Sequence, residues 1–297
     1  MAYAADAPAA RGTARTCGPE RVRSSESSIR TTRDAHPALL GRVVLSALMP
    51  HSQHQFLEHP PGNTAMIRSL DQADLRNHQA WIRGDQSGRR LEYSGKTLSG
   101  DTSTGANLVA ATFTNCCFDN MTFRGCDFTG AYFTDCTFAG CAFHTSYLQD
   151  TSFLRTDLAG VSFRGCPMPG CRFVQSALDR ADLSDATLTK STFHECTLKA
   201  ADLRDAQLRR STFSACSLRE SSLVAATAER AGFLDVDLRG ARVDEMLLSG
   251  TRFVRCGLAG LGGKPRLREV FLVEPDYSPA FDGSHIVSAE AVLRDWS

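Results

Sequence analysis

The sequence predicts an all-β fold in which the chain winds as a four-sided coil, and three regularities lead to that prediction. From Leu108 to Leu258 every fifth residue is apolar without one insertion, which gives 31 consecutive centres, 14 of them Phe and 14 Leu. The residue two positions before each centre is nearly always small, and nine of the eleven Cys stand there. Every fourth centre belongs to an unbroken Phe column: Phe113, Phe133, Phe153, Phe173, Phe193, Phe213, Phe233 and Phe253.

A period of five matches neither the 3.6 residues of a helix nor the 2.0 of a flat strand, so the chain must turn at regular intervals. We expect each pentad to form one short side whose large centre and small partner point inward while the other three residues face water. Four such sides close one coil, and coils stack at the ordinary strand spacing of about 4.8 Å. The 31 pentads correspond to about 7.75 coils and a rod of ~37 Å at that spacing.

The segment AADLRDAQLRRSTFSACSLRESSL, residues 200–223, resembles the pentapeptide-repeat family, whose pattern is A(D/N)LXX. The resemblance implies a right-handed quadrilateral parallel β-helix, a solenoid that we assign to residues 91–260. Tyr93 and Leu98 keep the pentad register before Leu108, while Ser103 breaks its chemistry, so the first coil is expected to be irregular.

Two segments precede the predicted solenoid. Residues 1–62 are rich in Ala, Arg, Ser and Pro and lack periodicity, which predicts disorder or a misassigned start, with Met49 or Met66 as the real beginning. Residues 63–90 are predicted to form an N-terminal helical cap over the open end of the first coil, where unpaired strand edges otherwise invite association. Apolar residues recur there at mostly helical spacing over 64–83: Met66, Leu70, Ala73, Leu75, Ala80 and Trp81.

A mixed C-terminal cap is predicted over residues 261–297. A cluster of four Gly between residues 257 and 263, followed by Pro265, is expected to end the repeat. The segment REVFLVEP, residues 268–275, favours a strand, and Ser288 to Trp296 a short helix with Ser288 as its N-cap. The family resemblance implies that such a terminal element can form a homodimer.

Composition and spacing exclude several functions. The 33 basic residues equal the 33 acidic ones, so net charge does not indicate direct binding of nucleic acid. No membrane span is expected, because the longest apolar run, residues 38–49, is shorter than the roughly 20 residues required. The in-register Cys follow the pentad spacing and not that of metal ligands, so we interpret them as reduced, buried residues that supply packing volume. A filled interior leaves no pocket for chemistry, so we expect no enzyme, cofactor or metal.

The outer face that flanks the Phe column is the candidate site. From Thr112 to Val254 it carries no acidic residue, is rich in Thr, and presents apolar side chains outward. Such a neutral strip is typical of a protein-contact surface, although Thr and Val also favour strands for their shape alone. The candidate contact residues are Tyr132, Leu154, Val174, Leu234 and Val254.

Three functions remain open. The first is a non-catalytic, bacterial-like, cytoplasmic scaffold that binds an unidentified protein partner through a solenoid face. The second, implied by the family, is protection of a type II topoisomerase, DNA gyrase or topoisomerase IV, by imitating duplex DNA. That role requires an acidic rod, whereas residues 106–260 contain 17 acidic and 16 basic side chains. The third is a secreted effector whose signal lies within residues 1–62.

Overall fold

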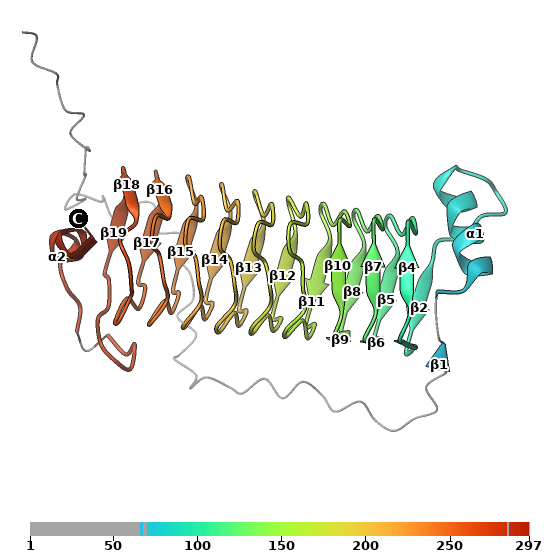
Figure 1. Ribbon diagram of the computed structural model, residues 1–297, viewed down its shortest axis with the longest axis horizontal. Helices are drawn as coiled ribbons and strands as arrows, with labels where there is room; N and C mark the ends of the chain where they lie inside the picture. Colours follow the sequence, from blue (N-terminus) through green and yellow to red (C-terminus); the bar gives the residue numbers. More distant parts are fainter. Residues whose placement is uncertain (1–65, 68–69, 284, 297) are drawn as a thin grey trace, which may run out of the picture.

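The computed structural model describes residues 66–67, 70–283 and 285–296, which form a rod of stacked coils with one helix at each end (Figure 1). The predicted fold class is confirmed, because the rod is a parallel β-solenoid of about nine turns. The prediction for residues 1–62 lies outside the described residues.

Four walls surround the interior, and we name them A to D in the order in which the chain visits them. Wall A contains β2 (Glu92–Ser94), β5 (Thr112–Thr114), β8 (Tyr132–Thr134), β11 (Ser152–Leu154), β12 (Arg172–Val174), β13 (Thr192–His194), β14 (Thr212–Ser214), β15 (Gly232–Leu234), β17 (Arg252–Val254) and β19 (Phe271–Val273). Wall B contains β1 (Met66–Ile67), β3 (Thr97–Ser99), β6 (Cys117–Asp119) and β9 (Thr137–Ala139). Wall C contains β4 (Thr102–Thr104), β7 (Thr122–Arg124) and β10 (Ala142–His144), and wall D contains β16 (Leu247–Ser249) and β18 (Arg266–Arg268). Beyond these strands, single parallel bridges continue walls B, C and D at the same spacing of four pentads.

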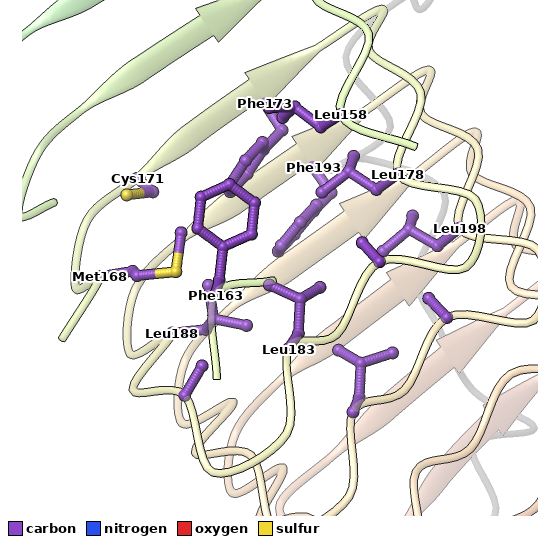
Figure 2. Close-up of a cluster of buried hydrophobic side chains, with 14 of the residues drawn as sticks. Leu158, Phe163, Met168, Cys171, Phe173, Leu178, Leu183, Leu188, Phe193 and Leu198 are labelled. Carbon is purple, nitrogen blue, oxygen red and sulfur yellow. The ribbon is translucent and has the colours of Figure 1, made fainter. Parts of the chain in front are cut away.

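The predicted centres fill the interior. The Phe rings of wall A stack face to face, with Phe193 and Phe213 at 4.5 Å and 5° between ring planes. Tyr93 meets the first ring of this column edge-on, and Trp296 meets its last ring, Phe253, edge-on at 5.8 Å. Figure 2 shows the same wall beside Phe163 and the Leu centres of its neighbours, all directed into one core. The aromatic column therefore runs the length of the rod and ends in edge-to-face contacts, which aromatic pairs favour.

The small inward residues do more than occupy volume. Thr151 donates its hydroxyl to the Phe128 carbonyl oxygen at 2.9 Å, and Cys171 donates its thiol to the Leu148 carbonyl oxygen at 2.9 Å. In both cases the acceptor belongs to the preceding coil. The interpretation of this column as packing alone was therefore incomplete, because Ser, Thr and Cys also satisfy buried carbonyl groups that would otherwise cost free energy.

Every pentad ends at a corner residue with left-handed backbone. From Ala110 to Gly260 each fifth residue has a positive φ, and the set includes Arg, Lys, Glu and Asp as well as Gly. Thr145 is the most strained of them, since a β-branched residue at φ 50° is rare. The corner residues share no residue type, so the sequence pattern does not reveal this column.

The N-terminal helix is shorter than predicted. Residues 66–67 form β1, which pairs in parallel with β3, and α1 begins at Gln72 and ends at Ile82. Asp71 sets this start, because its side chain accepts from the backbone N–H groups of Ala73 and Asp74, as an N-cap does. Helix α1 is joined to the first coil by Tyr93, whose hydroxyl donates to Asp74 Oδ2 at 2.8 Å.

The solenoid continues past residue 260, where the sequence analysis placed its end. Strand β19 pairs with β17 so that Leu272 faces Phe253, and this turn is one residue shorter than the four full pentads of the earlier coils. The chain then folds back through an antiparallel bridge between Asp276 and Ile286. Helix α2 (Ala289–Trp296) buries Val292, Leu293 and Trp296 and closes the C-terminal end. No helix among residues 66–67, 70–283 and 285–296 is long and apolar enough to span a membrane.

Candidate interaction face

The outer face of wall A consists of two rows of side chains, one on each side of the buried centres. Each strand places its first and third residues outward and its middle residue inward, since side chains alternate along a strand. Consecutive strands pair without a shift, so that Ser152 lies beside Arg172 and Leu154 beside Val174. The result is a regular surface that runs across ten strands.

All five predicted contact residues lie outward on this face. Tyr132 is 49% exposed and Leu234 is 39% exposed, while Leu154, Val174 and Val254 are half-buried among their neighbours. Tyr132 stands in the row of first residues and the other four in the row of third residues.

The sequence predicted one continuous strip on this face, but the structure shows that the face is divided. Leu154 pairs with Val174, and Leu234 pairs with Val254, but His194 and Ser214 lie between the two pairs. His194 Nδ1 and Ser214 Oγ are hydrogen-bonded at 2.8 Å. The face therefore presents two aliphatic clusters with a polar interval between them.

Two residues of the second cluster were missed. Val273 pairs with Val254 and is 40% exposed, and Phe271 pairs with Arg252, whose guanidinium lies 5.6 Å from its ring. Both follow the shortened turn, so a strict register of five does not find them. The strand predicted over residues 268–275 contains both residues, but it was assigned to the C-terminal cap and not to wall A.

One edge of wall A carries two Asp–Arg ion pairs. At the corner that leads to wall B, Arg155 contacts both carboxylate oxygens of Asp135 at 2.7 and 2.8 Å, and Arg255 binds Asp235 in the same way at 2.6 Å. Each pair joins adjacent coils. The Asp135 carboxylate raises the pKa of Arg155, as the Asp235 carboxylate does for Arg255.

Several buried thiols are poorly suited to chemistry, with Cys116 as an exception, because its hydrogen bond with Cys136 lowers its pKa to about 7. Burial raises the pKa of Cys141 and of Cys166 to about 11 and that of Cys256 to about 12, so these groups stay protonated at neutral pH. All ten Cys in the described part of the chain are free. Within the same residues, no three His, Cys, Asp or Glu side chains are grouped so that they could hold a metal ion.

A polar hollow of about 340 Å³ lies between α1 and the first coil. It exists because Ser103 stands where later coils of wall C place Phe123 and Phe143. Its lining includes Gln72, Arg76, Gln79, Asp101, Thr102, Thr104 and Asn107, but no His or Cys. The hollow is apart from wall A and contains none of the predicted contact residues.

Comparison with known proteins identifies the repeat. The family model described as "Pentapeptide repeat region" matches residues 106–183, 146–223 and 186–262, which together span more than half of the chain. No curated protein matches the chain.

Solved structures of repeat proteins are similar to the rod. HetL, a pentapeptide repeat protein involved in heterocyst differentiation regulation from the cyanobacterium Nostoc, is 16% identical over 70% of this chain and 94% of its own, with a TM-score of 0.34. QnrB1, a plasmid-mediated fluoroquinolone resistance protein, is 23% identical over 61% of this chain and 89% of its own, with a TM-score of 0.33.

Proposed function

Since this chain belongs to the pentapeptide-repeat family, we propose that its rod is a non-catalytic scaffold that binds a protein partner through the outer face of wall A. The observation that supports this most directly is the character of that face. Between Thr112 and Val254 it has no acidic side chain, and it presents two aliphatic clusters and an exposed Tyr132 on a regular sheet. Exposed apolar clusters rimmed by polar side chains are a feature of protein-interaction sites.

The filled interior of the rod supports the proposal that the scaffold is not catalytic. Every centre from Leu108 to Leu258 is buried, and burial holds the thiols of Cys166 and Cys256 beside them in their protonated form. Side chains fill the space that an active site would require. We assign the scaffold to the cytoplasm because the thiols in the described part of the chain, including the neighbouring Cys116 and Cys136, are free, as is usual in reducing compartments.

No comparable observation supports the DNA-mimic alternative. Imitation of a duplex needs a rod of consistently negative surface, whereas acids and bases are nearly balanced in residues 106–260. Wall A itself presents Arg172 and Arg252 outward and no acid between Thr112 and Val254. The secreted-effector alternative depends on residues 1–62, which are outside the described part of the chain.

The proposed function is tested by affinity capture from the native cell with the full chain and a double variant of wall A. We expect Leu154→Lys with Val174→Lys to reduce partner capture at least tenfold, because two charges would be placed in the aliphatic cluster. Stability should change little, since neither side chain fills the core.

The matched control is Ala139→Lys with Ala159→Lys on wall B, where both side chains are exposed. This pair adds the same charge and should leave capture unchanged. Equal loss in both pairs, or unchanged capture with the wall A pair, would reject the face.

A further inference from the structure

Three cations are stacked along the edge of wall A that adjoins wall D. Lys190, Arg210 and Arg230 occupy the corner position of three successive coils, and we call them the basic ridge. The backbone fixes this stacking, because Lys190 N–H donates to the Arg209 carbonyl oxygen at 2.9 Å and Arg210 N–H to the Glu229 carbonyl oxygen at 2.9 Å. All three side chains are exposed.

The ridge is not neutralised by the part of the chain that the structure describes. None of its three side chains forms an ion pair or a hydrogen bond with a residue there. The acid in the adjacent row, Glu229, is bound by Arg209 at 2.6 Å. Along the corner itself, the nearest acids are Asp150, with Gly170 between it and Lys190, and Glu269, with Gly250 between it and Arg230.

The opposite edge of wall A shows that the fold can neutralise such a column. There, Asp135 binds Arg155 and Asp235 binds Arg255 between adjacent coils. Adjacent coils lie about 4.8 Å apart, so like charges at successive corners repel each other. An acidic group outside the rod that lies against this column of three cations would relieve the repulsion.

The outer face of wall A indicates whether a nucleic acid or a protein supplies that acidic group. The ridge flanks the polar interval of wall A, and the coils on either side carry the clusters Leu154–Val174 and Leu234–Val254. A nucleic acid would supply phosphates to the ridge but no apolar groups to these clusters. A protein segment with carboxylates and aliphatic side chains complements both features.

The N-terminal segment, residues 1–65, does not have this chemistry. It contains seven Arg and five acidic residues, and so it is net basic. Charge complementarity therefore favours a separate, acidic protein over the N-terminal segment as the occupant.

We propose that the partner of wall A is a protein with an acidic segment, whose carboxylates lie against Lys190, Arg210 and Arg230 while its aliphatic side chains contact the neighbouring clusters. This inference rests on the proposed function and specifies its partner. Arg172 and Arg252 are both exposed in the row of first residues of wall A and add positive charge to the same face.

The test uses the full chain and three fluorescent probes: a peptide that combines glutamate with leucine, the same peptide with glutamine for glutamate, and a short DNA duplex. Replacing the ridge by Lys190→Ala, Arg210→Ala and Arg230→Ala should weaken the glutamate peptide about tenfold, or about 1.4 kcal/mol. The glutamine peptide should bind weakly and equally to both proteins. The triple variant should fold, because Ala already occupies corner positions 110, 200, 215 and 225.

The control triple is Arg124→Ala, Arg180→Ala and Arg219→Ala, which removes the same charge from exposed positions on other walls. It should change the affinity less than about twofold, because exposed charges beyond a Debye length of about 8 Å are screened at physiological salt. Equal weakening by both triples would overturn the proposal, since net charge alone would then explain binding. Tighter, ridge-dependent binding of the duplex would also overturn it, in favour of a phosphate backbone. Self-association that the ridge triple abolishes would do the same, in favour of a second copy.

The two proposals fail differently. If the captured partner is lost with Leu154→Lys and Val174→Lys but retained by the ridge triple, the wall A face stands and the acidic partner is rejected. If neither variant changes capture, both proposals are rejected.

Discussion

Wall A carries Phe at the centre of every coil from Phe113 to Phe253, whereas wall C changes from Phe to Leu after Phe163. The outer surfaces differ as well. Wall A is a continuous ten-stranded sheet, while wall C has three strands and then single bridges at residues such as Asp182 and Asp202. The same pentad period therefore supports two kinds of wall.

At two of the bridged coils of wall C, an Asp before the centre bends the backbone. In wall C, Asp202 accepts from the Arg204 N–H at 3.1 Å, and Asp182 accepts from the Ser184 N–H at 3.1 Å. Such Asx turns bend the backbone directly after the centre. In wall A the corresponding positions include Thr192 and no Asp, and the backbone stays extended for three residues. An Asp before the centre therefore accounts for the bend at these two coils, whereas other bridged positions, such as Ser162 and Thr197, carry no Asp.

The largest effect is expected from the Phe column. Phe173→Ala or Phe193→Ala should lower the free energy of unfolding by ~3–5 kcal/mol, because each leaves a cavity in a closed interior. Both rings are fully buried and stack at 4.7 Å. Leu203→Ala on wall C should cost less, since no ring stacking is lost. Denaturant melts that show under about 1 kcal/mol for both Phe variants would contradict the account.

A smaller effect on stability should distinguish the Asx turns of wall C from the extended strands of wall A. Asp202→Ala on wall C is expected to cost about 1 kcal/mol, because the Arg204 N–H loses its acceptor. Thr192→Ala at the matching position of wall A should change stability by less than about 0.5 kcal/mol. Chemical denaturation of both variants checks this, and equal costs would show that the Asp does not specify the turn.

The corner column offers a stabilising change. Thr145→Gly should raise stability by about 1 kcal/mol, because glycine adopts the left-handed backbone without a Cβ clash. The reciprocal Gly165→Thr, one coil further along the same corner, should lower it by a similar amount. Gly165 has φ 65° and open space around its missing Cβ, so backbone strain alone is measured. If neither variant changed the melting temperature, backbone strain at the corner would not contribute to stability.

Mild acid should give the smallest change, and it reports on the N-terminal end. His78 is fully buried, its Nδ1 accepts from the Leu91 N–H at 3.0 Å, and burial lowers its pKa below the ordinary 6.5. The unfolded chain therefore binds the proton more readily than the folded chain does. The contribution of neutral His78 to the free energy of unfolding is complete above pH 6.5 and is lost as pH falls toward the folded pKa. His78→Gln should remove that dependence. A wild-type profile that is flat between pH 7 and 5 would contradict it.

The sequence was sufficient for the interior, because the pentad period and the Phe column identify every inward centre from Leu108 to Leu258. Backbone conformation at the corners was not predictable in the same way. The coil imposes a positive φ on whatever residue stands there, so Arg210 and Glu220 carry no local signal of it. The last coil was missed because its shortened spacing breaks the rule on which the prediction rested.

The candidate face was predictable in composition but not in extent. Counting acids along the register found the neutral wall and its five contact residues. Exposure and neighbour relations required the structure, which shows two clusters and adds Val273. The basic ridge was also missed. Each of its members lies four pentads from the next in the sequence, at a corner position, and only the structure shows that they are stacked.

Site-specific photocrosslinking tests the central claim most directly. A photoreactive residue placed at Thr134, Leu154 or Leu234 on wall A, or at Ala139 or Ala159 on wall B, reports which wall lies against the captured partner. The account predicts that the partner is crosslinked from the wall A positions and not from wall B. Crosslinks that come mainly from wall B, with wall A positions silent in a folded protein, would contradict it.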